Sequence, residues 1–229
     1  MFKPQQKFMV DAAIFDLDGT IIDTIGIYYQ IVDAVLERLN LPQVSRRDLR
    51  NATENGRFDW SVILPEEIKE NKEELIKHAW KIGEEMYPKM FFDKVRLFPG
   101  ATEVLTSLSQ KGIKLAVVTS TPKKNMTSKL KPLIKSGIRH LIKEIITADD
   151  TTRTKPAADP LIECHQRLGI TAEKSVYVGD MRLDIKAGKA AGTKTIGVLT
   201  GFDDFESLKT EKPDAIITSI SELPDVIRM

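Results

Sequence analysis

The stretch Asp16-Leu17-Asp18-Gly19-Thr20 follows directly on the apolar run Ala12-Ala13-Ile14-Phe15. A short apolar run bounded in this way predicts a buried β-strand. Because side chains alternate along a strand, we expect Asp16 and Asp18 on the same side just beyond its end, with Gly19 permitting a sharp turn. Two carboxylates at a strand end suit metal-assisted phosphate chemistry, and an acidic turn without chemistry is the alternative.

Beyond Pro99 the chain alternates apolar strands with helical segments. This alternation predicts a parallel sheet with helices on both faces. The strand at 12–15 belongs with the later strands, so the helical region between them is expected to be an insertion. The predicted fold class is α/β, with a Rossmann-like parallel sheet core at 1–24 and 97–229 and an inserted all-helical cap at 25–96. Further strands are predicted at 115–118, 144–147, 175–178, 195–198 and 215–218.

Helical spacing dominates the inserted region. Apolar residues recur every four positions from Ile27 to Leu39, and residues 66–87 place apolar side chains on one side and charges on the other. No convincing strand is predicted between Thr24 and Phe98.

Composition restricts the classes of partner. Of the 229 residues, 41% are hydrophobic and 29% charged, and the formal net charge of +1 gives no basis for binding nucleic acid or an anionic membrane. The one cysteine, Cys164, excludes an intrachain disulfide and is expected to be buried. His78, His140 and His165 lack metal-ligand spacing and are interpreted as surface or cap positions. With no run of about 18 apolar residues, the chain is expected to be a cytoplasmic protein. The sequence leaves open whether it is a monomer or a homodimer.

Polar residues of complementary type follow several predicted strands. In an open α/β sheet, ligands collect beyond the carboxyl ends of the strands. Each residue also has an ordinary structural explanation. Thr119 and Ser120 could be capping donors, since Thr121-Pro122 looks like the N-cap and N1 of a helix; Lys155 could be a solvated lysine and the aspartates turn or first-turn residues. Their occurrence together at successive strand ends favours a site. These residues are Asp16, Asp18, Thr119, Ser120, Lys155, Asp180 and Asp184.

Four segments carry a resemblance to a known family. FDLDGT, VVTST, the KP of KPAADP and VGDMRLD resemble the four motifs of the haloacid dehalogenase-like hydrolase superfamily, from Val10 to about Gly201, and the insertion resembles its all-helical cap. GTIIDT and KPAADPLIECHQRLGI are similar to the phosphoglycolate phosphatase and β-phosphoglucomutase branch. The resemblance implies a Mg²⁺-dependent phosphatase that hydrolyses a small phosphomonoester metabolite through an aspartyl phosphate.

The resemblance also implies roles for the site residues. Asp16 would be the nucleophile, a role that suits a carboxylate because it needs no deprotonation at neutral pH. Asp18 would protonate the leaving oxygen and then activate water. Thr119, Ser120 and Lys155 would bind the phosphoryl group, and Lys155 would also steady the ionised Asp16. The implied Mg²⁺ ligands are Asp16, the backbone carbonyl of Asp18, Asp180 and, directly or through water, Asp184.

The same residues also allow other functions to be compared with hydrolysis. Asp18 argues against a metal-independent dehalogenase. A phosphosugar mutase commonly has Glu-Asp where this chain has Gly179-Asp180, and a hinge histidine near the position of Tyr28, so hydrolysis is preferred. A cap lysine forming a Schiff base, as in phosphonoacetaldehyde hydrolases, stays open. A receiver-like phosphoryl switch or a silent phosphate-binding scaffold is disfavoured by the DLDGT pattern and the large insertion.

Substrate choice is expected to lie in the cap. Residues 49–60 combine Gly56 with Arg57, Phe58 and Trp60, which could contact a small anionic or hydroxylated leaving group. A loop that joins cap helices and packs its aromatics inward is an equally good interpretation. Hinges are expected near Ile25-Gly26 and Arg96-Leu97.

Overall fold

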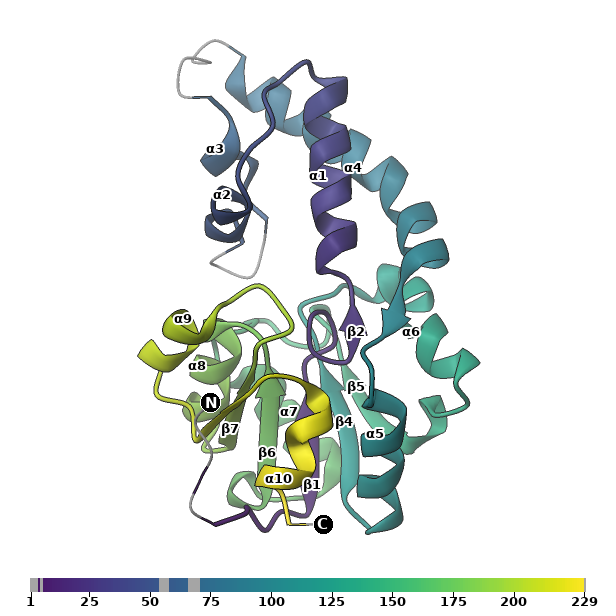
Figure 1. The fold of residues 1–229 in the computed structure, drawn as a ribbon, viewed down its shortest axis with the longest axis vertical. Helices are drawn as coiled ribbons and strands as arrows, with labels where there is room; N and C mark the ends of the chain where they lie inside the picture. Colours follow the sequence, from purple (N-terminus) through teal and green to yellow (C-terminus); the bar gives the residue numbers. More distant parts are fainter. Residues whose placement is uncertain (1–3, 5, 54–57, 66–70, 229) are drawn as a thin grey trace. The chain divides into compact units, whose positions relative to one another are not determined.

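The computed structural model describes residues 4, 6–53, 58–65 and 71–228 of the chain (Figure 1). It divides into two compact units. The core unit comprises Met1–Asp23 and Arg96–Met229, and the helical unit comprises Thr24–Val95. Each unit is described by itself.

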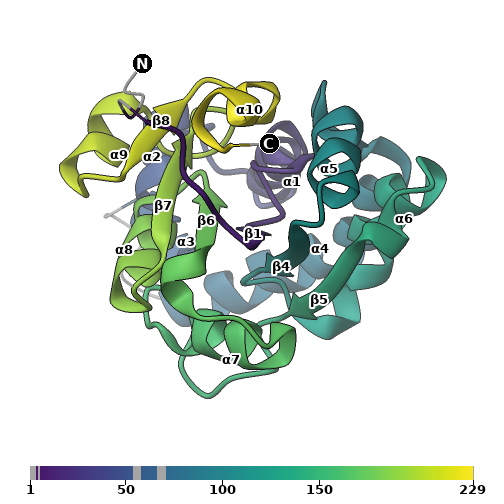
Figure 2. The ribbon, with the colours of Figure 1, turned by 90° about the horizontal axis from the view of Figure 1, so that it is seen from below.

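A six-stranded parallel sheet forms the centre of the core unit, with strand order β5-β4-β1-β6-β7-β8. Figure 2 shows α7 and α8 on one face of the sheet and α5 and α10 on the other. All four residues of β1 are fully buried, as expected for a strand covered on both faces. The predicted α/β fold class is therefore confirmed. The strands are β1 (Ala12–Phe15), β4 (Lys114–Val118), β5 (Ile142–Ile146), β6 (Ser175–Gly179), β7 (Lys194–Val198) and β8 (Ala215–Ile217).

Helices and 3₁₀ turns connect these strands. Three of the connections matter for the site: the turn and helix after β4, the loop before α7, and the turn from β6 into α8. The elements are α5 (Ala101–Gln110), η1 (Lys123–Asn125), α6 (Met126–Lys135), η2 (Arg139–Leu141), α7 (Asp159–Leu168), η3 (Ala172–Lys174), α8 (Arg182–Ala190), α9 (Phe205–Thr210), η4 (Ile220–Glu222) and α10 (Leu223–Val226).

Two short strands of the core unit were not predicted. Strand β2 (Ile22–Asp23) pairs antiparallel with β3 (Arg96–Leu97) at the points where the chain leaves and re-enters the core unit. The prediction of no strand between Thr24 and Phe98 is wrong because of β3. Two residues are too few to produce an alternating pattern, and the pairing depends on a partner more than 70 residues away in the sequence.

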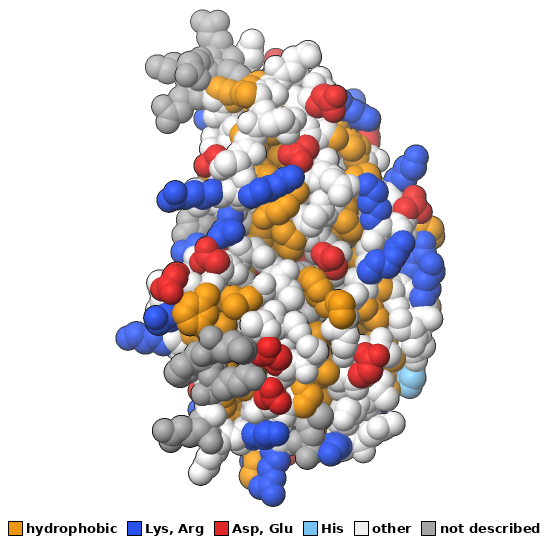
Figure 3. Space-filling view, in the orientation of Figure 1, with side chains coloured by type: hydrophobic (Ala, Val, Ile, Leu, Met, Phe, Trp, Pro, Cys, Tyr) orange, Lys and Arg blue, Asp and Glu red, His pale blue; other side chains and the backbone are white. Residues whose placement is uncertain are grey.

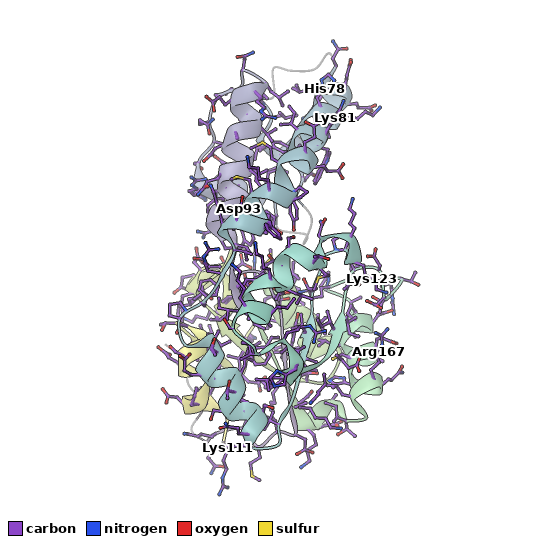
Figure 4. All side chains as sticks on the ribbon, turned by 90° about the vertical axis from the view of Figure 1, so that its right-hand side faces the viewer. His78, Lys81, Asp93, Lys111, Lys123 and Arg167 are labelled. Atoms are coloured by element: carbon purple, nitrogen blue, oxygen red, sulfur yellow. The ribbon has the colours of Figure 1, made fainter. Side chains whose placement is uncertain are left out.

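The helical unit contains α1 (Ile25–Arg38), α2 (Arg46–Asn51), α3 (Trp60–Ile63) and α4 (Lys72–Lys94). Helix α1 packs on α4, where the ring of Tyr28 meets the ring edge of Phe91 at 5.0 Å between centroids. His78, Lys81 and Asp93 lie along the polar side of α4 (Figure 4). The prediction for residues 49–60 missed α2, which begins after Ser45, whose hydroxyl accepts a hydrogen bond from the N–H of Asp48.

The surface and the interior of the molecule match most of the expectations drawn from the composition. Figure 3 shows basic and acidic side chains interspersed over the visible face, and no described helix is long and apolar enough to cross a membrane. Cys164 is fully buried, as predicted. The surface interpretation of His165 is wrong, since His165 is buried against Ser175, with 2.9 Å between Nε2 and Oγ. Its spacing with Leu161 and Leu168 already placed it on the inner side of α7.

Candidate active site

The strand order brings the predicted site residues to one edge of the sheet. Strand β1 lies between β4 and β6, with Phe15 in register with Val117 and Val178. Parallel strands end at the same edge, so the residues that follow these strands are neighbours in space. Those residues are Asp16 after β1, Thr119 and Ser120 after β4, and Asp180 after β6.

Lys155 lies at the centre of this edge. Its ammonium is 2.7 Å from Oδ1 of Asp16 and 2.6 Å from Oδ1 of Asp184, and it also donates to the hydroxyl of Tyr177 at 3.0 Å. The side chains of Lys155, Asp16 and Asp184 are all at most 9% exposed. Tyr177, whose role was not predicted, thus braces the lysine from β6. Three of the predicted residues therefore form one buried ionic cluster.

Burial and crowding change the acidity of this cluster. Burial raises the pKa of Asp16 to about 7, with Asp184 and Asp18 adding to the rise and Lys155 opposing it. The pKa of Asp180 is raised well above its ordinary range by burial and by Asp16 and Asp184. Burial opposes the charge of Lys155, but Asp16 and Asp184 more than offset this and hold its pKa well above 10.5. Lys155 alone therefore does not balance the buried carboxylates, and a further positive charge in the site would favour their ionised forms.

Asp180 is held in a tight backbone cradle. Its Oδ1 accepts from the hydroxyl of Thr20 at 3.1 Å, and its Oδ2 accepts from the N–H of Phe202 at 2.9 Å. A Cβ at Gly201 would lie 1.8 Å from Oδ2, and one at Gly19, where φ is +78°, would lie 2.6 Å from it. Both positions therefore require glycine for Asp180 to occupy this place.

Three carboxylates are arranged as a metal could use them. One oxygen from each of Asp16, Asp180 and Asp184 lies within 4.8 Å of the others, and all three residues are buried. An all-oxygen, anionic donor set is the kind that Mg²⁺ prefers. The raised pKa values of Asp16 and Asp180 are what buried carboxylates show when their charge is incompletely balanced. The residues present fit a divalent cation.

The side chain of Asp18 belongs to a different cluster. Its Oδ2 is 2.5 Å from the ammonium of Lys129 and accepts from the hydroxyl of Thr121 at 3.0 Å. Lys129 also donates to Oγ1 of Thr121 at 2.9 Å. Oδ1 of Asp18 is buried and has no hydrogen-bond partner among the residues that the structure describes. Nothing in the sequence pattern distinguishes Lys129 from the other lysines of α6.

The loop after β4 differs from its expected capping role. The hydroxyl oxygen of Thr119, 4% exposed, accepts from the N–H of Thr121 at 3.1 Å, while Ser120 is half-buried. The alternative interpretation of Thr121 as a helix N-cap is wrong, because the 3₁₀ turn η1 has Pro122 at its N-cap position and the Thr121 hydroxyl donates to Asp18. Asp184 does support the start of α8, accepting from the N–H of Met181 at 3.0 Å while its other oxygen receives Lys155.

The predicted specificity segment is described only in part. Arg57 lies outside the described residues. Trp60 is 3% exposed and its ring meets that of Phe58 at 4.9 Å, so these aromatics pack together within the helical unit.

Comparison with known proteins places the chain among hydrolases. The family described as haloacid dehalogenase-like hydrolase matches residues 13–198. The phosphoglycolate phosphatase of Escherichia coli K12 is 30% identical over 230 residues, covering 91% of this chain and 89% of that protein. A solved Haemophilus somnus structure, described as a predicted phosphoglycolate phosphatase, is similar with a TM-score of 0.80 and 25% identity, covering 96% of this chain and 99% of the other. A Thermotoga maritima protein provisionally assigned as a β-phosphoglucomutase is also 25% identical, with a TM-score of 0.71 and coverage of 94% and 97%.

Proposed function

The chain belongs to the haloacid dehalogenase-like hydrolase family, and on that basis we propose that it is a Mg²⁺-dependent phosphatase of a small phosphomonoester metabolite, acting through an aspartyl phosphate on Asp16. The observation that carries the proposal is the buried cluster of Asp16, Lys155 and Asp184 beside Asp180 at one edge of the sheet. The phosphoglycolate phosphatases among its relatives make 2-phosphoglycolate the first substrate to test.

Asp16 is the proposed nucleophile. One of its carboxylate oxygens forms a bond to phosphorus as the bond from phosphorus to the leaving oxygen breaks. Lys155, bonded to Oδ1 of Asp16, favours the ionised form of that carboxylate against the effect of burial. Such a cluster supports nucleophilic attack because Lys155 orients Asp16 and opposes the protonation that burial favours.

Asp18 is the proposed acid and base. In the first step it gives a proton to the leaving oxygen. In the second step it takes a proton from a water whose oxygen attacks phosphorus, the bond from phosphorus to Asp16 breaks, and inorganic phosphate leaves. The Oδ1 atom of Asp18 is buried and has no hydrogen-bond partner within the described part of the chain, which supports this division of roles.

Phosphate binding is assigned to Lys155 with Thr119 and Ser120. The Thr119 oxygen accepts the N–H of Thr121, which leaves its own proton for a phosphoryl oxygen. The metal would be held by Asp16, Asp180 and the carbonyl of Asp18, with Asp184 in support. When bound, Mg²⁺ supplies the positive charge that offsets repulsion between the phosphate dianion and these carboxylates.

A phosphate-release assay over small phosphorylated metabolites, with and without Mg²⁺, tests the proposal. We expect Mg²⁺-dependent turnover of at least one ester and its near-complete loss in Asp16→Asn, with the fold intact by circular dichroism. Unaltered turnover in Asp16→Asn would remove the nucleophile assignment. Stable phosphorylation of Asp16 without turnover would favour a phosphoryl switch, and isomerisation of a phosphosugar would favour a mutase.

Arg57 remains the proposed specificity residue of the helical unit. Arg57→Ala is expected to raise KM for the natural substrate but to spare a small generic phosphate ester. Equal effects on both esters would exclude Arg57 from substrate selection.

A further inference from the structure

Lys129 is a buried lysine that the proposed mechanism does not use. It lies on α6, and its side chain is only 1% exposed. Lysine is almost never fully buried unless its charge is paired, because removing an ammonium from water is strongly unfavourable. Lys135 of the same helix, by contrast, is exposed. The burial of Lys129 therefore points to a particular partner.

That partner is the carboxylate of Asp18, 111 residues earlier in the chain. The Lys129 ammonium and the Thr121 hydroxyl converge on the same oxygen, Oδ2, at 2.5 and 3.0 Å. The ammonium also donates to the Thr121 oxygen at 2.9 Å, so that the hydroxyl proton is directed to Asp18. The three groups form a closed hydrogen-bonded ring that fixes the orientation of the carboxylate.

The ring makes the two oxygens of Asp18 unequal. Oδ2 already accepts two hydrogen bonds, one of them from a charged donor, whereas Oδ1 is buried without a partner among the described residues. A proton on Oδ2 would displace one of its two donors. Oδ1 is therefore the oxygen open to proton exchange.

We infer that Lys129 is a positioning residue, which with Thr121 holds Oδ2 of Asp18 so that Oδ1 exchanges the proton with the leaving group and then with water. This inference rests on the proposed phosphatase function and adds a residue to it. Lys155 pairs with Asp16 and with Asp184, and Lys129 pairs with Asp18, so the two carboxylates of the DLDGT motif contact two different buried ammonium groups.

Esters with different leaving groups test this role, because only a poor leaving group needs protonation. The variant is Lys129→Met, which keeps a side chain of similar length, and the control is Lys135→Met on the exposed side of the same helix. For 2-phosphoglycolate, whose leaving oxygen is an alkoxide, we expect kcat/KM to fall about 100-fold, within the usual range for general acid catalysis. For p-nitrophenyl phosphate we expect a fall of less than about 5-fold, since nitrophenolate leaves without a proton.

The second chemical step supplies an independent readout. Attack by water needs Asp18 as base for every substrate, so Lys129→Met should release one equivalent of nitrophenolate in a rapid burst before slow turnover. A merely structural lysine would lower kcat/KM by the same factor for both esters and give no burst, and that result would overturn the inference. Thr121→Val keeps the ammonium and should change the ratio of kcat/KM for the two esters in the same direction. If Lys129→Met does not fold, this second variant tests the inference in its place. Wild-type protein that hydrolyses none of the phosphorylated metabolites of the screen under any metal condition would instead overturn the proposed function.

Discussion

Replacing Asp16 by asparagine should make the metal-free protein more stable at the same time as it abolishes turnover. Asp16 is buried beside Asp184 and Asp18, and its pKa is raised to about 7 from an ordinary 3.8. The folded protein therefore binds the proton more tightly than the unfolded chain does. Between these two pKa values the unfolded chain carries fewer protons, so the free energy of unfolding falls as pH rises from about 4 to 7.

The size of the effect follows from the same values. At ~1.4 kcal/mol for each pH unit, a carboxyl with a pKa of about 7 lowers the stability of the folded state by at most about 4 kcal/mol above pH 7. Asparagine removes this charge while Lys155 keeps Asp184 as its counter-ion. We expect Asp16→Asn to raise the free energy of unfolding by about 2–4 kcal/mol at pH 8 in EDTA, and the melting temperature by about 5–15 °C.

Thermal unfolding at pH 5 and pH 8, in EDTA and in Mg²⁺, measures the effect. The advantage of Asp16→Asn should be smaller at pH 5, where the wild-type carboxyl is protonated in the fold. Mg²⁺ should stabilise the wild type more than the variant, because the variant lacks one anionic ligand. The reasoning is refuted if Asp16→Asn is no more stable than the wild type at pH 8, or if its advantage is the same at both pH values.

Three other substitutions test the surrounding contacts. Lys155→Met leaves buried carboxylates uncompensated, so it should reduce turnover at least ~100-fold in kinetic assays and destabilise the fold by about 3–5 kcal/mol in EDTA. Unchanged stability in unfolding assays would contradict the ionic cluster. Tyr177→Phe should lower stability by about 1–2 kcal/mol and kcat by less than tenfold, since it removes one brace from Lys155; a loss as large as that of Lys155→Met would be inconsistent with a brace. Gly201→Ala should weaken activation in a Mg²⁺ titration, because the new Cβ would lie 1.8 Å from Oδ2 of Asp180. Gly83→Ala, whose new Cβ would have its nearest neighbours at 4.0 Å, is the matched control, and equal effects of the two variants would exclude displacement of Asp180 as the cause.

The strands that carry the site could be predicted because each is a buried apolar run with polar residues at its end. Strand β1 has the predicted bounds, 12–15, and the other strands of the sheet differ by one or two residues. Burial on both faces makes such runs continuous rather than alternating, and this is a strong local signal. Helix α2 and the pair β2–β3 were missed because they are short and depend on caps or distant partners.

Lys129 and Tyr177 could not be predicted from the sequence for a different reason. Tyr177 looks like any aromatic residue of a buried strand, and its hydroxyl becomes relevant only because Lys155 and Asp184 lie within 3.0 Å of it. Lys129 looks like any lysine of a basic helix. Their importance is a property of the tertiary contacts, and periodicity carries no information about which buried polar group will be a partner.

The DLDGT motif cannot balance its own charge. A strand end places two carboxylates close together, and the next residues along the chain, Gly19 and Thr20, offer no cation. The compensating ammonium groups come from Lys155, 139 residues away, and Lys129, 111 residues away. Lys129 reaches the motif from α6, which follows β4, a neighbour of β1 in the sheet. Lys155 reaches it from the loop between β5 and α7, where Tyr177 of β6 and Asp184 of α8 also accept hydrogen bonds from its ammonium. The central position of β1 in the sheet is thus what allows two neighbouring acids to be stabilised separately, as two different chemical roles require.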